Sequence, residues 1–258
     1  MALSVFWKMK RTFDPNEPEL MDRPQPVTPA FESEMRNLAS INRHFGSHRL
    51  ICKFLDLWLT PGRSYSVLDL CTGGGDIPRL MSDWARARDI TLRIDAIDAS
   101  EASIELARRA SADYPEIRFE RANALKFESK ETYDLVVCSL ALHHFSEDEA
   151  VRLLRLTRNL SHRFVLVSDL ERSLFTLAGV HFLTTFCYRE AMTRADGITS
   201  VHRAFSFAEF RALAEAADWQ NFGHARFLWC RQALWIDLHV AGDVPLADAV
   251  AEGLPCPT

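Results

Sequence analysis

Residues 66–78 read SVLDLCTGGGDIP, and this stretch decides the fold class. Its first part is a short run rich in Val and Leu, which is typical of a strand covered on both faces of a sheet. Gly73, Gly74 and Gly75 follow directly, and Pro78 then stands where a helix would begin, a position that proline favours. Because glycine permits sharp turns and a close approach of the backbone to a ligand, the stretch predicts a binding loop between a strand and a helix. A tight turn without a ligand is the simpler alternative.

Four more apolar runs alternate with helical stretches further along the chain: LRIDAI, IRFER, YDLVVCS and RFVLVS. This alternation predicts a doubly wound α/β fold, a parallel sheet with helices on both faces. Ser146 with Glu149, and Ser206 with Glu209, have the spacing of capping boxes, so a helix should begin at each place. The last two runs, FGHARFLW and RQALWIDL, can pair in antiparallel fashion if the chain turns near Cys230. We therefore expect a Rossmann-like, mostly parallel sheet of seven strands with a C-terminal antiparallel hairpin.

The chain divides into five predicted segments. Five of the eleven prolines fall before residue 30, which predicts an extended arm over 1–30. Apolar residues at helical spacing predict a helical cap over 31–62, ahead of a ligand-binding core over 63–172. An insertion over 173–205 is rich in large apolar side chains, and 206–258 supplies the last helix and the hairpin.

Charge and cysteine content limit the expected partners. The formal net charge is -5 and basic residues form no long run, so a nucleic-acid partner is not expected. The six cysteines lack metal-binding spacing and predict reduced thiols in a cytoplasmic protein. No apolar stretch reaches the roughly 20 residues of a membrane span, and the first residues lack the order of a secretory signal. The oligomeric state is left open.

Two carboxylates narrow the expected ligand. A dinucleotide fingerprint would need a small residue where this chain has Pro78, and the phosphate-binding P-loop pattern is absent. Asp69 lies inside the first strand, and Asp98 ends the second, where a carboxylate can hold the two hydroxyls of a ribose. A nucleoside without a pyrophosphate therefore fits the pattern better than a nicotinamide dinucleotide.

The chain resembles the class I S-adenosylmethionine-dependent methyltransferases, in particular the small-molecule branch that includes ubiquinone and menaquinone biosynthesis methyltransferases. The resemblance spans roughly residues 64–170 and rests on VLDLCTGGGD, IDAIDAS, RFERANAL and YDLVVCSLALHHF, in the family's order. It implies S-adenosylmethionine as cofactor. The residues implied to bind it are Asp69, Cys71, Gly73, Gly75, Asp98, Ala99, Asn123, Ala124, Ser139 and Leu140.

The resemblance also implies a role for each part of this set. The loop that begins at Asp69 would surround the methionine part, Asp98 would bind the ribose, and Asn123 would border the adenine. Two positions depart from the family pattern, which usually has glycine at Cys71 and aspartate at Asn123. We expect a tighter loop at Cys71, whereas Asn123 still offers a donor and an acceptor to the adenine edge.

His143 and His144 are the candidate catalytic residues. They follow the fourth predicted strand, at the sheet edge where open α/β folds bind ligands. Methyl transfer needs positioning and exclusion of water, and a base only if the acceptor arrives protonated. Adjacent residues point in different directions, so we expect one histidine to reach the acceptor; packing roles for both are the alternative. No metal is expected, because Leu170 follows Asp169 where catechol-type relatives have an asparagine.

Four further residues are weaker candidates. Arg43 and Arg49 could contact the cofactor carboxylate, and His202 and Arg203 could line the acceptor pocket, but a solvated helix end and a surface turn explain them better. The insertion carries a helical stripe that suits either core packing or an apolar lid: Phe175, Leu177, Phe182, Leu183, Phe186 and Tyr188. As a lid it would favour a small aromatic, quinol or polyketide-like acceptor, methylated on oxygen or carbon.

The sequence leaves other functions open. A macromolecule methyltransferase is disfavoured by the balanced charge and by SLAL at the end of the fourth strand, where amine and amide methylases carry an NPPY-type loop. A non-catalytic cofactor-binding or scaffold protein would keep the same fold and the same loop. A nicotinamide oxidoreductase is disfavoured by Pro78.

Overall fold

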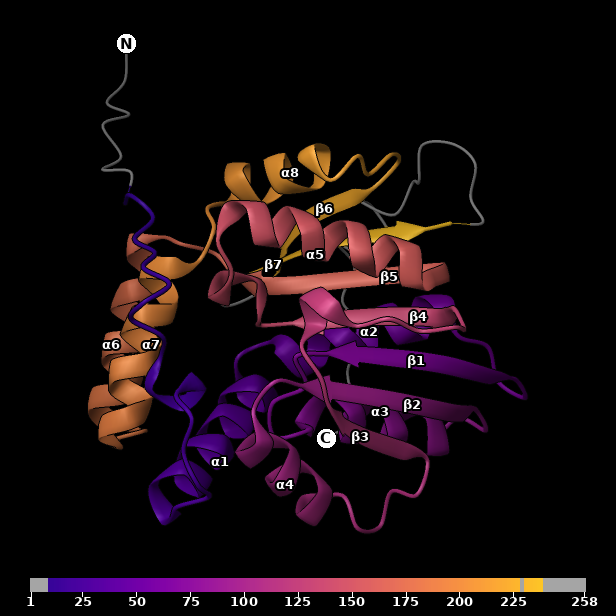
Figure 1. The fold of residues 1–258 in the computed structure, drawn as a ribbon, viewed down its shortest axis with the longest axis horizontal. Helices are drawn as coiled ribbons and strands as arrows, with labels where there is room; N and C mark the ends of the chain where they lie inside the picture. The colour runs from indigo at the N-terminus through magenta and orange to yellow at the C-terminus, as the bar shows by residue number, and fades with distance from the viewer. Residues whose placement is uncertain (1–8, 228–229, 239–258) are drawn as a thin grey trace.

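The computed structural model describes residues 9–227 and 230–238. Its central feature is one sheet with the strand order β3-β2-β1-β4-β5-β7-β6 (Figure 1). The strands are β1 (Ser64–Leu70), β2 (Thr91–Asp98), β3 (Ile117–Arg121), β4 (Tyr133–Ser139), β5 (Ser161–Leu170), β6 (Gly223–Phe227) and β7 (Arg231–Asp237). Neighbouring strands are parallel except that β7 runs antiparallel to both β5 and β6. The predicted seven-stranded, mostly parallel sheet with its C-terminal hairpin is confirmed.

Helices cover both faces of this sheet (Figure 1). They are α1 (Pro29–His44), α2 (Ser47–Trp58), α3 (Asp76–Arg86), α4 (Glu101–Ala110), α5 (Glu147–Leu160), α6 (Leu174–Phe186), α7 (Ala191–Arg203) and α8 (Phe207–Ala216), with short 3-10 turns η1 (Leu20–Asp22), η2 (Ala124–Lys126) and η3 (Leu142–His144). One apolar core joins α2, α3 and α4 to one face, and a second joins α5 and α8 to the other. Val67 packs in the first core and Leu68 in the second, as the two-residue repeat of a strand requires.

Local signals determine where the helices begin. Ser146 and Ser206 form capping boxes with Glu149 and Glu209, as predicted, and these place the first turns of α5 and α8. Gly46 separates α1 from α2 with a φ of 97°, a left-handed conformation that glycine adopts without strain. The two predicted N-terminal helices therefore follow each other with almost no linker.

The α6–α7 pair lies beside the carboxyl edge of the parallel strands, and the N-terminal arm, residues 9–28, runs along it (Figure 1). Arg203 of α7 donates to the backbone carbonyls of Asp14 and Glu17. Asp196 of the same helix accepts the backbone N–H groups of Leu20 at 2.7 Å and Met21 at 2.9 Å. These contacts fix the arm against α7 and close one side of the sheet edge.

Within residues 9–227 and 230–238, no helix has the length and apolar character that crossing a membrane requires.

Candidate active site

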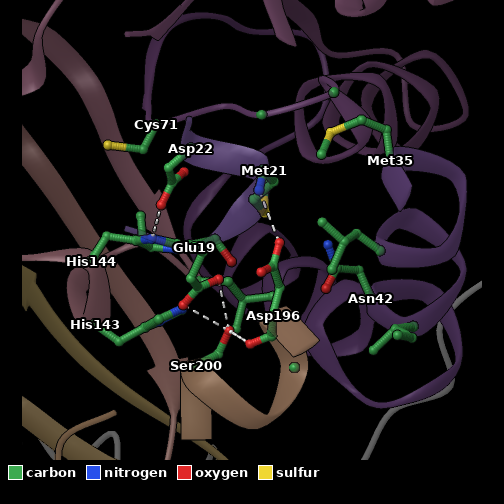
Figure 2. Close-up of a pocket in the computed structure, with 18 of the residues that line it drawn as sticks. Glu19, Met21, Asp22, Met35, Asn42, Cys71, His143, His144, Asp196 and Ser200 are labelled. Atoms are coloured by element: carbon green, nitrogen blue, oxygen red, sulfur yellow. Dashed lines mark hydrogen bonds and ion pairs between the residues drawn. The ribbon is translucent and has the colours of Figure 1, made fainter. Parts of the chain in front are cut away.

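A cavity of about 780 Å³ lies at the carboxyl edge of the sheet. Its lining comes from the loops after β1, β2, β4 and β5, from α1, from the α6–α7 pair, and from the arm. Figure 2 shows how side chains from these separate segments point into the same space. The cavity therefore lies where open α/β folds bind ligands, and where the sequence places the candidate site.

The glycine loop forms one wall of the cavity. Gly73 has a φ of 55° and donates its N–H to Asp98 Oδ2 at 2.9 Å, so the loop after β1 is tied to the end of β2. A Cβ at Gly73 would meet nothing within 4 Å, whereas a Cβ at Gly75 would lie 2.9 Å from the ring of Phe119. Gly73 therefore keeps its side of the loop open, and Gly75 permits close packing of the loop against the core.

Cys71 adopts the backbone conformation that favours glycine. Its φ is 60°, in the left-handed region, at the position where the family pattern usually has glycine. The thiol lies against Cys138, and this contact together with burial raises the pKa of Cys71 well above its ordinary value. The thiol is therefore neutral, and the departure from glycine introduces backbone strain and no reactive thiolate.

Two carboxylates face the glycine loop. Asp69 is buried, and its Oδ2 has no hydrogen-bond partner among the described residues. Burial raises the pKa of Asp69 to about 7. Asp98 accepts from the backbone N–H groups of Gly73 and Ser100, and burial raises its pKa as well. A buried carboxylate oxygen without a partner at the cavity wall is an acceptor that a bound cation or hydroxyl would satisfy.

The other residues implied to bind a cofactor also lie around this cavity: Ala99, Asn123, Ala124, Ser139 and Leu140. Asn123 accepts the N–H of Leu125 with its side-chain oxygen, which leaves its amide N–H₂ group for a ligand. Ser139 and Ser168 share a hydrogen bond of 3.0 Å at the ends of β4 and β5. The structure thus brings all ten predicted residues to one place, with Gly75 packed just behind the wall.

Both candidate catalytic histidines line the same cavity. Their rings are adjacent, with centroids 4.2 Å apart, because the 3-10 turn η3 carries them side by side. The expectation that the two point in different directions is therefore wrong. His143 is 3% exposed, and its Nδ1 lies 2.7 Å from Asp169 Oδ1 while its backbone N–H donates to Asp169 Oδ2. This double contact fixes the imidazole with Nε2 on the side of Glu19, 3.8 Å from Glu19 Oε1.

His144 is held in a similar way by the arm. Its Nδ1 lies 2.7 Å from Asp22 Oδ2 (Figure 2). Burial alone would lower the pKa of His144, but the carboxylates of Glu19, Asp22 and Asp169 outweigh it and raise the pKa to about 10. Both imidazoles are thus paired with carboxylates, one from the end of β5 and one from the arm.

Sequence reasoning missed two groups of site residues. Glu19 and Asp22 come from the proline-rich arm, far from the core in sequence, and no motif links them to the histidines. Arg231 begins β7, is 4% exposed and lines the cavity, with its Nε donating to Ser47 Oγ at 2.8 Å. The one available signal was its position as the first residue of a predicted strand at the sheet edge.

Four predicted residues lie elsewhere. Arg43 and Arg49 are exposed and do not line the cavity. His202 and Arg203 also lie outside it, and Arg203 is buried because it binds the arm. The cavity lining therefore gives no support to a role of these four at the cofactor or acceptor. Of the predicted lid residues, Phe175, Phe182 and Leu183 line the cavity, and Leu177, Phe186 and Tyr188 do not.

Comparison with known proteins agrees with this geometry. Residues 67–162 match a family model described as a methyltransferase domain. No curated protein matches the chain. Among solved structures, the plantazolicin methyltransferase BpumL in complex with SAH has a TM-score of 0.60 at 15% identity, over 82% of this chain and 91% of that chain.

Two other solved structures are similar at the level of the fold. The plantazolicin methyltransferase BamL, in complex with a triazolic desmethylPZN analog and SAH, has a TM-score of 0.56 at 17% identity, over 76% of this chain and 69% of that chain. Magnesium protoporphyrin IX methyltransferase (ChlM) from Synechocystis PCC 6803, with bound SAH, has a TM-score of 0.51 at 17% identity, over 83% of this chain and 90% of that chain.

The fold and the site define the class: this chain has the Rossmann-like methyltransferase fold. The domain match supports the predicted enzyme class, a methyltransferase, with the matched segment running from β1 to the start of β5. A special relation to the ubiquinone and menaquinone branch stays a prediction.

Proposed function

We propose that this chain is an S-adenosylmethionine-dependent methyltransferase that methylates an oxygen or carbon of a small, largely apolar acceptor. One observation carries the proposal: the glycine loop, Asp98 and the paired histidines all line a single cavity. Cofactor and acceptor can therefore lie in one cavity, where they can be held in line for the displacement. The SAH bound in the structures of the neighbours supports the choice of cofactor.

The polar groups of the cavity fit this cofactor. Asp98, at the end of β2, is placed to accept the ribose hydroxyls, and Asn123 to contact the adenine. The methionine part carries an ammonium and a carboxylate. Asp69 has an oxygen without a partner for the ammonium, and Arg231 is a buried cation for the carboxylate. In the described part of the chain, no carboxylate lies within ion-pair distance of Arg231.

The cofactor supplies a methyl group on a positively charged sulfur. The protein's own part is to hold the acceptor in line with that group and to keep water out. A bound cofactor would offer this methyl group to a hydroxyl oxygen of the acceptor, and the residues of the cavity would hold that oxygen in line with it. The acceptor proton then leaves at the histidine end of the cavity. Asp169 orients His143 for this contact, with Nε2 toward the acceptor side.

The lid sets the character of the acceptor. Phe175, Phe182 and Leu183 line the cavity from α6, and Met35 and Leu38 line it from α1. These side chains suit an aromatic or other apolar body, while Glu19, Asp22 and the histidines suit one polar, ionisable group on it. We therefore favour a phenol, quinol or enol of an aromatic or polyketide-like compound over an acceptor that is charged throughout.

Calorimetry tests this proposal directly. We expect SAM and SAH to bind at one site per chain, and methylation of at least one member of a panel of phenols, quinols and polyketide enols, detected by mass spectrometry. Absence of SAM and SAH binding would refute the enzyme proposal. Binding without turnover on any acceptor would favour the scaffold alternative, and turnover on RNA or protein would favour a macromolecular acceptor.

His143 has its own test. Replacement by Ala should lower turnover at least tenfold while SAH still binds, because the acceptor loses its polar contact and not the cofactor site. His162, on the surface beside Asp134, gives a matched control for removal of a carboxylate-paired histidine. Equal turnover of H143A and the wild type would refute the catalytic assignment.

A further inference from the structure

We propose that Glu19, His143 and His144 form a binding site for a divalent transition-metal ion at the polar end of the cavity. The three side chains come from the arm and from η3, and each offers one ligand atom, with all these atoms within 4.8 Å of one another. Two histidines and one carboxylate are a donor set that proteins use for Fe²⁺, Mn²⁺ and Zn²⁺. The sequence predicts no metal, because Leu170 follows Asp169 where catechol-type relatives have an asparagine, and Glu19 is not among the residues that the sequence singles out as ligands.

The three donor atoms lie within 4.8 Å of one another, so they would have to move closer together to share one metal ion. Donor atoms that share one metal at bonds of about 2.1 Å lie about 3.0–3.4 Å apart. His143 Nε2 and Glu19 Oε1 are 3.8 Å apart, too far for a hydrogen bond and a few tenths of an ångström beyond the metal-bound separation. His143 is almost fully buried and its Nε2 faces Glu19, so this nitrogen can serve as a ligand.

The surroundings orient each ligand as they do at known metal centres. Metal-binding histidines usually direct their second ring nitrogen to a carboxylate, which fixes the ring. His143 does so to Asp169 and His144 does so to Asp22, both at 2.7 Å. Ser200 Oγ contacts both oxygens of Glu19 at 3.0 Å (Figure 2). Each of the three ligands therefore has its own supporting partner.

The charge of this end of the cavity favours a cation. Glu19, Asp22 and Asp169 surround the two imidazoles, and Glu19 and Asp169 are almost fully buried. Buried carboxylates are costly unless a cation or hydrogen bonds compensate them. Metal binding would displace protons from the imidazoles, and a divalent ion would then neutralise these carboxylates in their place.

The proposed ion would keep positions open toward the cavity. Three protein ligands with the remaining positions free are typical of catalytic metal sites, not structural ones. The ion would bind the acceptor through oxygen, as a phenolate, an enolate or the two neighbouring oxygens of a catechol-like compound. This step rests on the proposed function and refines it: the oxygen bound there would be the one that accepts the methyl group, and His143 Nε2 would hold the ion instead of contacting the acceptor directly.

Metal titration tests the site without relying on activity. The untagged, chelator-treated protein is titrated with Zn²⁺ by calorimetry and with Co²⁺ by visible absorption, with Mg²⁺ as a hard-ion comparison. We expect one equivalent of Zn²⁺ or Co²⁺ to bind at micromolar or lower concentration, with Mg²⁺ much weaker. Glu19→Gln and His143→Gln should weaken binding at least tenfold, and Asp22→Asn about 10- to 100-fold as the loss of an orienting partner. His162→Gln, which alters a histidine outside the cavity, should leave it unchanged.

SAH binding separates the two proposals and reports folding of each variant. Absence of stoichiometric Zn²⁺ and Co²⁺ binding in a protein that binds SAH would refute the metal site and leave the methyltransferase proposal standing. Unchanged affinity in both Glu19→Gln and His143→Gln would place the ion elsewhere and also refute the site. Absence of SAH binding would refute the proposed function independently of the metal result.

Discussion

Replacement of Arg231 by Gln should weaken the binding of SAH and spare a ligand that lacks its amino-acid group. Arg231 begins β7, lines the cavity and is almost fully buried. Burial lowers the pKa of Arg231 to about 10, and the guanidinium is therefore still charged at neutral pH. A buried cation without an ion-pair partner in the described chain is a receptor for an anion, and the carboxylate of the methionine part is the anion that the proposed cofactor brings.

The size of the effect follows from one charge-assisted contact. A hydrogen bond to a charged group contributes about 1.5–3 kcal/mol, and about 1.4 kcal/mol corresponds to a tenfold change in affinity. Arg231→Gln should therefore weaken SAH binding roughly 10- to 150-fold. The glutamine can keep a hydrogen bond to Ser47 in place of the 2.8 Å contact of Nε, so the fold should survive. Arg231→Lys keeps a charge and should lose less.

Calorimetry with two ligands makes the test specific. SAH carries the amino-acid group, whereas 5′-methylthioadenosine has the same nucleoside without it. We expect Arg231→Gln to lower SAH affinity only, with methylthioadenosine bound as in the wild type. Arg43→Gln, an exposed arginine outside the cavity, is the matched control. Equal losses for both ligands, or no loss for either, would refute the role of Arg231 as the carboxylate receptor.

Three further predictions concern stability. Cys71→Gly should raise Tm by about 1–3 °C, because relief of the left-handed conformation at φ 60° outweighs the added chain entropy; a lower Tm would show that thiol packing dominates. Gly75→Ala should lower the free energy of unfolding, measured in urea, by about 2–4 kcal/mol, because the new methyl group would lie 2.9 Å from the ring of Phe119. Gly73→Ala should lower it by only about 1–2 kcal/mol, because a Cβ there has nothing within 4 Å. Equal losses for the two variants would contradict the packing argument. Burial raises the pKa of Glu34 to about 7, so the folded state binds its proton more tightly and stability falls as pH rises from about 4.5 to 7. Glu34→Gln should therefore gain Tm over the wild type at pH 8 and little at pH 4.5; a difference independent of pH would contradict this.

The fold was predictable because its signals are local. Short Val- and Leu-rich runs predict buried strands, and the capping boxes at Ser146 and Ser206 place two helices correctly. Even the antiparallel pairing of β6 with β7 follows from two strand-like runs close in sequence. The turn between them, at residues 228–229, lies outside the described residues.

The site was predictable only in part, for a physical reason. Residues at the ends of parallel strands meet at one edge, so Asp69, Asp98 and the histidines could be expected together. Glu19 and Arg231 reach the same edge through tertiary packing, one in an arm fixed to α7 and one at the start of an antiparallel strand. Sequence separation carries no information about such contacts. Arg43 and Arg49 show the converse: their charge made them candidates for the cofactor carboxylate, but neither side chain lines the cavity.

The family match covers only part of the cavity lining, and the flanking segments supply the rest. The matched residues, 67–162, contain the glycine loop, Asp98 and the histidines, which line one part of the cavity. The arm and the α6–α7 pair lie outside this range, yet they supply the apolar wall and the carboxylate that faces His143.

Because Asp196 and Arg203 tie the arm to α7, docking of the arm and completion of the polar end are one event. Glu19 and Asp22 reach the histidines only while the arm is held there. Acceptor identity should therefore depend on the segments that the domain match omits, and exchange of the arm and lid between proteins of this fold should change the acceptor without changing the affinity for SAH.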